Sequence, residues 1–254
     1  MSISGISSYS TADYASLASG RRISSAADDA AGLSISEKLT TESNGLSVAS
    51  SNAEAGNDLL KVADGALSGI ADSLQRIREL GVQASNTAVN SPSDISAMQK
   101  EIEGLKQSIQ DTAKGTSFNT KKLLDGSMAD LNLATNPQGG GKTIQLADST
   151  LESLGIADFD VTGDFDLQTI DDAIAKVSEA RSSIGAQSNS LTAAVRSNDY
   201  TAQNTTAANS RLADEDYGAK LTEQKKDEAM EKYRIFSLNA QRENEAGILK
   251  LFQQ

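Results

Sequence analysis

The sequence contains no cysteine, no histidine and no tryptophan, and among its 254 residues only two are proline and 4% are aromatic. Without cysteine the chain can form no disulfide framework, no thiolate metal site and no cysteine nucleophile. Without histidine it lacks the commonest general base and the commonest transition-metal ligand. We therefore expect a protein that is not an enzyme and that binds no cofactor.

Positive charge is also scarce. The formal net charge is -12 and the sequence pI is about 4.5, which argues against nucleic acid or an anionic membrane as a partner. No apolar run approaches the roughly 20 residues that span a bilayer, so we expect no membrane insertion. The first 22 residues have no basic region followed by an apolar run, and we expect no cleaved secretory signal.

Much of the apolar content is alanine, whose small side chain buries little area. One large compact core is therefore not expected. The composition favours a thin rod of few helices whose remaining apolar surface is covered by neighbouring chains.

A long helix is predicted over residues 26–88, because apolar residues recur there every seven positions in two series. The two series are Leu60, Leu67 and Leu74, and Ala63, Ile70, Ile77 and Ala84. Gly65 and Gly69 lower the intrinsic helicity of this segment, and we expect them to permit a close helix approach. A turn containing Pro92 then leads into a second helix over 93–112, predicted to fold back antiparallel on the first.

A third helix is predicted over residues 167–211, with Ile170, Val177, Ile184 and Leu191 at seven-residue spacing. The region 117–166 before it contains two alternating segments around a Gly-rich tip, which indicates a β-hairpin. A charged helix follows Asp216. The predicted fold is mainly α: an elongated helical rod or coiled-coil bundle of paired N- and C-terminal helices with a small β-hairpin insert. Residues 26–211 form the rod domain, and residues 1–25 and 212–254 are terminal assembly segments.

Clusters of acidic residues occur at 28–29, 158–166 and 214–216. Paired carboxylates can hydrolyse glycosides or bind a divalent cation, but these lie at helix starts or in a polar connector and lack the calcium-loop spacing. Helix capping and solvation are the favoured interpretation. The stretch Gly139–Thr143 superficially resembles a phosphate-binding loop, but a hairpin tip fits its context better.

Two segments carry candidate interaction surfaces. In the first, Arg76 and Leu80 are expected to face partly outward, a combination that suits a protein interface, although an ordinary solvated arginine beside a rim leucine remains open. The second is the C-terminal helix, whose apolar positions suggest an amphipathic segment covered by a partner helix or a chaperone. Its candidate residues are Tyr233, Phe236, Leu238, Ile248, Leu249, Leu251 and Phe252.

Several segments closely resemble bacterial flagellin, in the order of that family. They are LASGRRISSAADDAAGLSISEKL (17–39), GALSGIADSLQRIRELGVQASN (65–86), TSFNTKKLLDG (116–126), AIAKVSEARSSIGAQSNSL (173–191) and SRLADEDY (210–217). The resemblance implies a structural subunit of the flagellar filament, which self-assembles through its terminal helices, serves motility and lies outside the cell. It also implies export through the flagellar type III apparatus with an export chaperone.

The resemblance further implies a receptor interface. Arg76, Leu80 and Glu101 fall where the family contacts Toll-like receptor 5, with Gly81 standing where the family usually has alanine. The chain departs from the family in a shorter segment before Leu17 and in a more charged C-terminal helix. These departures leave alternatives open: a hook–filament junction protein, or a secreted ligand of the receptor that builds no standard filament.

Overall fold

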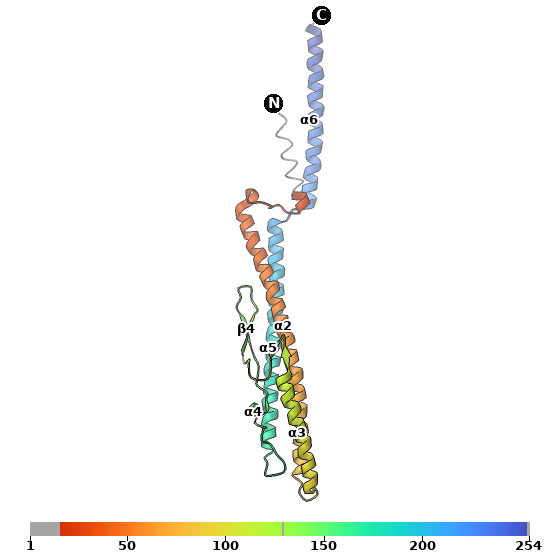
Figure 1. The fold of residues 1–254 in the computed structure, drawn as a ribbon. Helices are drawn as coiled ribbons and strands as arrows, with labels where there is room; N and C mark the ends of the chain where they lie inside the picture. The colour runs from red at the N-terminus through yellow and green to blue at the C-terminus, as the bar shows by residue number, and fades with distance from the viewer. Residues whose placement is uncertain (1–15, 129, 253–254) are drawn as a thin grey trace. The chain divides into compact units, whose positions relative to one another are not determined.

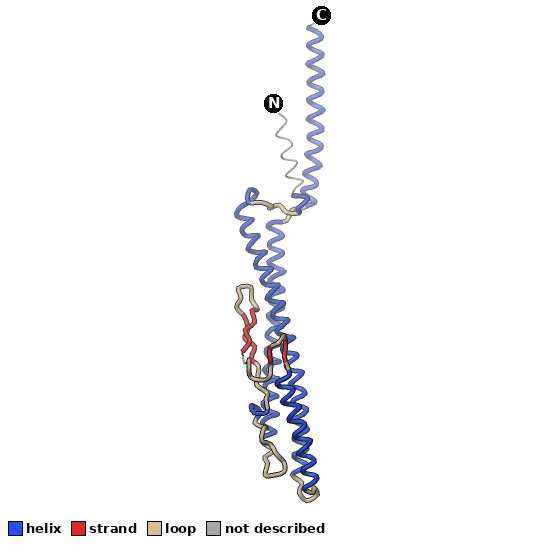
Figure 2. Tube along the Cα trace, in the orientation of Figure 1, coloured by secondary structure: helices blue, strands red, loops and turns tan. Residues whose placement is uncertain are grey.

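The computed structural model describes residues 16–128 and 130–252, and side chains as far as Ala246 (Figures 1 and 2). Its helices are α2 (Ala26–Ala84), α3 (Pro92–Gly115), α4 (Leu151–Leu154), α5 (Gln168–Ala213) and α6 (Tyr217–Phe252). Its strands are β1 (Ser117–Phe118), β2 (Lys121–Lys122), β3 (Asp130–Ala134) and β4 (Gly141–Gln145). The chain divides into two compact units, a central unit Glu42–Gln203 and a terminal unit formed by residues up to Thr41 and from Asn204 onward.

The core of the central unit lies between α2, α3 and α5, which run side by side in Figure 1. Both predicted seven-residue series of α2 are fully or almost fully buried, as is the series of α5. From α3, Met98, Ile102 and Ile109 join the same cluster. The mainly α fold, with long helices from both halves of the chain sharing one core, is confirmed.

The helix bounds lie close to those predicted, and local capping explains them. The side-chain amide of Asn90 donates to the carbonyls of Gln83 (2.6 Å) and Asn86 (3.0 Å), which ends α2 at Ala84 rather than near residue 88. α3 begins with a capping box in which Ser91 and Asp94 satisfy each other's backbone N–H groups.

The predicted hairpin is formed by β3 and β4, paired antiparallel with Leu131 opposite Ile144. Side-chain amides from the helices bind its backbone. Gln187 of α5 both accepts from the Gln145 N–H (2.9 Å) and donates to the Gln145 carbonyl (3.0 Å). Asn52 of α2 donates to the Ala134 carbonyl (3.1 Å). The hairpin is therefore docked on α2 and α5 by polar as well as apolar contacts.

Two short elements were not predicted. β1 and β2 pair through a turn in which Asn119 and Thr120 both have positive φ (46° and 67°), as a tight primed turn requires. α4 lies in the connector after the hairpin, and its N-cap is Thr150. Their small size explains why periodicity could not reveal them.

The expectation for Gly65 and Gly69 is wrong. Both are exposed, and a Cβ added at either position would meet nothing within 4 Å. Four other glycines of α2, Gly32, Gly45, Gly56 and Gly81, are closely approached instead. An added Cβ would lie 2.4 Å from Leu133 Cδ2 at Gly56 and 2.6 Å from Leu167 Cδ2 at Gly81.

In the terminal unit, residues near Gly20 are joined to residues near Asp214. Arg21 and Asp214 form an antiparallel bridge, the Glu215 N–H donates to the Gly20 carbonyl (3.0 Å), and the Tyr217 hydroxyl donates to the Leu17 carbonyl. These bonds tie the N-terminal segment to the start of α6.

The acidic pair at the start of α2 caps helices, as predicted. The Asp28 carboxylate accepts hydrogen bonds from the backbone N–H and hydroxyl groups of Ser24 and Ser25, which lower its pKa. Asp29 interrupts the helix (φ -163°, ψ 99°) and accepts from the Gly32 N–H at 2.8 Å. No helix in the described part of the chain is both long and apolar enough to cross a membrane.

Candidate interaction surfaces

The first candidate surface is built on the facing sides of α2 and α3. Arg76 donates from Nε to Glu101 Oε1 (2.9 Å), and its guanidinium also lies 3.0 Å from Glu79 Oε2. The hydrogen bond to Glu101, and then that to Glu79, raises the pKa of Arg76 above its usual value. The Arg76 side chain remains 47% exposed and that of Glu101 46%. The structure thus brings two of the three predicted receptor residues together in an accessible ion pair.

The prediction for the third residue, Leu80, is wrong. It was expected to face partly outward, but it is only 2% exposed and belongs to the core cluster. The reason is its position: it follows Ile77 by three residues and precedes Ala84 by four, and both of these are buried on the inner side of α2. The same spacing in the sequence could have revealed this.

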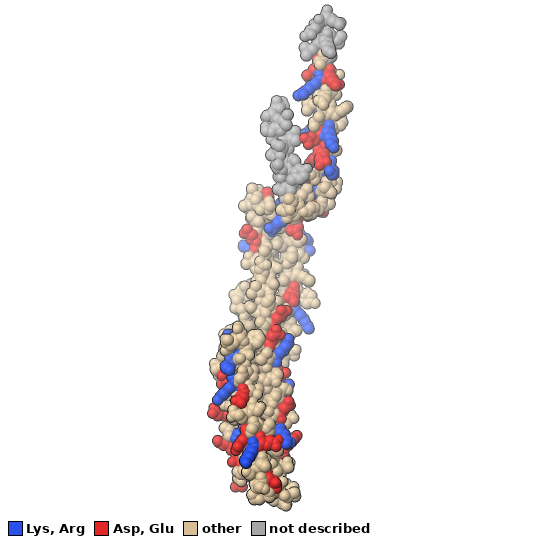
Figure 3. Space-filling view, turned by 45° about the vertical axis from the view of Figure 1, so that its right-hand side comes forward, with Lys and Arg blue, Asp and Glu red and all other residues tan. Residues whose placement is uncertain are grey.

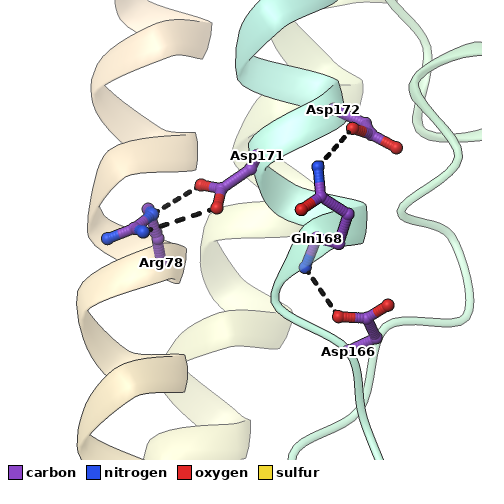
Figure 4. A network of polar contacts seen from close by, with 5 residues as sticks. All are labelled: Arg78, Asp166, Gln168, Asp171 and Asp172. Atoms are coloured by element: carbon purple, nitrogen blue, oxygen red, sulfur yellow. Dashed lines mark hydrogen bonds and ion pairs between the residues drawn. The ribbon is translucent and has the colours of Figure 1, made fainter.

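A second polar contact between helices lies at the start of α5 (Figure 4). Arg78 of α2 donates to both carboxylate oxygens of Asp171, at 2.5 and 3.4 Å, and this bond lowers the pKa of Asp171. Asp166 accepts from the Gln168 N–H (2.9 Å), and the Gln168 side chain donates to Asp172 (2.8 Å). The Arg78–Asp171 pair joins the first turn of α5 to α2, and the other two bonds stabilise that turn itself. Sequence reasoning missed the Arg78–Asp171 pair because its partners are 93 residues apart.

An open groove of about 610 Å³ runs between α2 and α5. Its floor includes Leu60, Ile174 and Ile184, and the ion pair between Arg181 Nε and Asp64 Oδ1 (2.8 Å) lies beside them. The described residues contain no group of three or more acidic side chains that could hold a metal ion. The acidic clusters act locally instead: Asp160, for example, accepts from the N–H and hydroxyl groups of Thr162.

The other candidate surface is α6. Tyr233, Phe236 and Leu238 are 69%, 72% and 56% exposed, in accord with their prediction as uncovered apolar residues. Leu221, Met230 and Ile235 are also more than half exposed. The remaining predicted residues, Ile248, Leu249, Leu251 and Phe252, have side chains outside the described part of the chain.

The exposed apolar residues of α6 are not confined to one face. At about 100° per residue, Met230, Tyr233 and Phe236 follow one another at steps of about 60°. On the same basis Ile235 and Leu238 lie about 160° and 140° around the helix from Tyr233. The amphipathic pattern that was expected is therefore wrong for this segment: its apolar side chains surround the helix.

Comparison with known proteins places both halves of the chain. The family profile for the bacterial flagellin N-terminal helical region matches residues 3–129, and that for the C-terminal helical region matches residues 167–243. The chain belongs to the bacterial flagellin family.

Relatives within that family align over most of their lengths. The chain is 37% identical to a flagellin of Halalkalibacterium halodurans, over 82% of this chain and 78% of the relative. It is 35% identical to a flagellin of Bacillus subtilis, over 87% and 85%. A flagellar filament core protein of Brachyspira hyodysenteriae is 29% identical over 95% of this chain and 91% of its own.

Solved structures show the same fold. The crystal structure of Bacillus cereus flagellin aligns with a TM-score of 0.51 at 27% identity, over 58% of this chain and 88% of that one. A Vibrio parahaemolyticus protein assigned to the flagellar hook-associated class aligns with a TM-score of 0.61 at 16% identity, over 74% of this chain and all of that one. The second likeness concerns the fold alone.

Proposed function

We propose that the chain is a structural subunit of the flagellar filament, exported without a cleaved signal peptide and without a catalytic role. Its membership of the flagellin family supports this, as do relatives named flagellin and flagellar filament core protein. Residues 1–25 and 212–254 are proposed as the assembly segments, and residues 26–211 as the rod domain.

The observation that carries the proposal is the distribution of apolar side chains around α6. A single groove covers one face of a helix, whereas apolar side chains that project from several sides of a helix need more than one neighbour to cover them. Exposed aromatic and aliphatic residues on opposite sides of α6 therefore fit a polymer, in which each helix meets more than one copy of the chain.

Polymerisation of the purified protein tests the proposal. Wild-type chain, with and without preformed polymer seeds, should form fibres visible by electron microscopy and recoverable by centrifugation. Tyr233→Ala/Phe236→Ala should assemble poorly, because it removes two exposed rings from α6 while leaving the core of the central unit intact. The matched control is Val48→Ala/Val89→Ala, which removes two exposed apolar side chains elsewhere and should assemble normally. Wild-type protein that never polymerises, seeded or not, would reject the proposal.

A junction protein between hook and filament is the alternative that the highly charged C-terminal helix leaves open. Such a protein would add to a preformed end without growing into long polymers of its own. The length distribution of seeded fibres separates the two cases, since a filament subunit extends every seed and a junction protein stops after a short layer.

We also propose that Arg76 and Glu101 contact Toll-like receptor 5, and that the region around Leu80 supports them from inside. The support is the family resemblance together with the exposed, mutually bonded pair. Arg76→Ala should weaken binding to the receptor ectodomain, while Lys100→Ala, an exposed neighbour on α3, should leave it unchanged. Equal binding by wild type and Arg76→Ala would reject this role.

For export, we propose that a flagellar chaperone and the type III apparatus receive the chain through its C-terminal helix. The exposed Tyr233, Phe236 and Leu238 support this. Binding of the purified chaperone should fall in Tyr233→Ala/Phe236→Ala and persist in the Val48/Val89 control. N-terminal sequencing of the secreted protein tests whether the first residues of the sequence are retained after export.

A further inference from the structure

Helix α6 carries many ionised side chains that bond to nothing in the described chain. Two of its lysines form ion pairs along the helix, Lys220 with Glu223 and Lys225 with Glu228, each at 3.1 Å. Eight further charged residues of α6 are exposed and have no hydrogen bond or ion pair with any residue that the structure describes. They are Lys226, Asp227, Glu231, Lys232, Arg234, Arg242, Glu243 and Glu245.

The segments whose side chains the structure does not describe contain few charged residues that could pair with them. Residues 1–15 contain a single charged side chain, that of Asp13, residues 247–254 contain only that of Lys250, and residue 129 is uncharged. At most one of the cations and one of the anions could therefore be paired by a side chain from those segments. In the free chain these exposed charges are hydrated, and a partner that covers α6 has to replace that water.

The eight residues are balanced in sign, with four cations and four anions. This balance is local, because the whole chain has a net charge of -12. Figure 3 likewise shows blue and red side chains mixed together in two groups along α6, with uncharged side chains between the groups. A surface of this kind is complementary to another copy of itself, whereas a strongly acidic or basic partner would leave half of its charges opposed to like charges.

The order of the charges also suits self-association. Opposite charges are sequence neighbours at three levels: Lys226 with Asp227, Glu231 with Lys232, and Arg242 with Glu243. Neighbouring residues project about 100° apart, so each level offers a cation on one side of the helix and an anion on another. Neighbouring copies of α6 packed around one helix can therefore place an anion beside each of its cations and a cation beside each of its anions.

From this geometry we infer that the unpaired charges of α6 form ion pairs with α6 of neighbouring copies. The inference rests on the proposed function. It adds that α6 selects other copies of the same chain by charge complementarity as well as by apolar contact. Burying the apolar side chains that surround α6 brings these charges out of water, and a buried charge without a partner strongly opposes association. Pairing between copies removes that obstacle.

Complementary charge reversals test the inference. One variant, Lys232→Glu/Arg234→Glu, makes the middle of α6 acidic, and the other, Asp227→Lys/Glu231→Lys, makes it basic. Each alone places like charges opposite one another, so the concentration needed for seeded polymerisation should rise about tenfold or more. An equimolar mixture should regain polymerisation, with both variants in the pellet. Far-UV circular dichroism of each variant checks that the helices are retained.

The matched control is Lys100→Glu/Lys142→Glu, which changes the net charge of the chain as much as the acidic variant does but on α3 and β4. It should polymerise like the wild type. If either reversal alone assembles like the wild type, or if the mixture does no better than its components, the inference is wrong while the proposed function stands. If the wild type itself does not assemble, the proposed function fails and the inference falls with it.

Discussion

Replacing glycine by alanine at different positions of α2 should raise the free energy of unfolding on one side of the helix and lower it on the other. Gly65 and Gly69 lie on its exposed side, where an added Cβ would meet nothing within 4 Å. Gly56 lies on its buried side, where the added atom would come within 2.4 Å of Leu133 Cδ2, 3.1 Å of Leu191 Cδ1 and 3.4 Å of Ile144 Cδ1. The change in the free energy of unfolding should therefore differ in sign between the two sides.

The magnitudes follow from helix propensity and packing. Alanine in place of glycine stabilises a helix interior by about 1 kcal/mol. Gly65→Ala should gain this in full. At Gly56 overpacking of about 1–3 kcal/mol opposes that gain, and the net effect is destabilising by up to about 2 kcal/mol. Leu191 and Ile144 are buried and cannot move aside freely, which is why the packing cost prevails.

Thermal unfolding followed by circular dichroism measures the difference. For a domain of this size, 1 kcal/mol shifts Tm by about 2–4 °C, so Gly65→Ala should raise Tm by that amount and Gly56→Ala should lower it. Gly81→Ala should fall between them, because its one severe contact is with the end of the flexible, half-buried Leu167 side chain. Equal stabilisation by Gly56→Ala and Gly65→Ala would refute the packing argument, and so would a lower Tm for Gly65→Ala.

Further predictions concern the core, the pH dependence and the connector. Leu74→Ala should lower the free energy of urea unfolding by about 2–5 kcal/mol, because Leu74 is fully buried; a loss below 1 kcal/mol, on the order of a surface substitution, would contradict its core position. The Arg78 hydrogen bond lowers the folded pKa of Asp171, so ionised Asp171 stabilises the fold above its unfolded pKa of about 3.9, and this contribution is lost as the pH falls through the folded value. Unfolding measured across that range should therefore be less pH-dependent in Asp171→Asn, and parallel curves would contradict the pairing. Lys106 Nζ donates to the carbonyls of Ala157 (2.5 Å) and Phe159 (3.2 Å), so Lys106→Met should speed hydrogen exchange around this part of the connector, while Lys100→Met should not.

Long helices could be read from the sequence because their packing is periodic. A residue every seven positions stays on one side of a helix, and the two series of α2 and the series of α5 are indeed the buried ones. The β3–β4 hairpin could be read for a similar reason, since alternation and a Gly-rich tip are local signals. The exposure of Tyr233 and Phe236 followed from the lack of an obvious cover within the chain.

The sequence alone misplaced features that depend on which neighbour comes close. It assigned close contact to Gly65 and Gly69 because glycine leaves space for a neighbouring helix. Whether a neighbour fills that space depends on the tertiary packing, and at these two positions none does. Leu80 is a different case: it was turned outward because it lies about one turn beyond Arg76, although its spacing from Ile77 and Ala84 already placed it on the buried side of α2.

By itself, then, the sequence determined the helical fold, the family and the absence of thiol and imidazole chemistry, since these depend on composition and local order. Only the tertiary structure decided which charges are paired. Arg78 with Asp171, and Arg181 with Asp64, meet across 93 and 117 residues of chain, a proximity that no local pattern encodes. The charged character of the C-terminal helix was evident in the sequence, but only the folded chain shows that eight of its charges have no partner among the described residues.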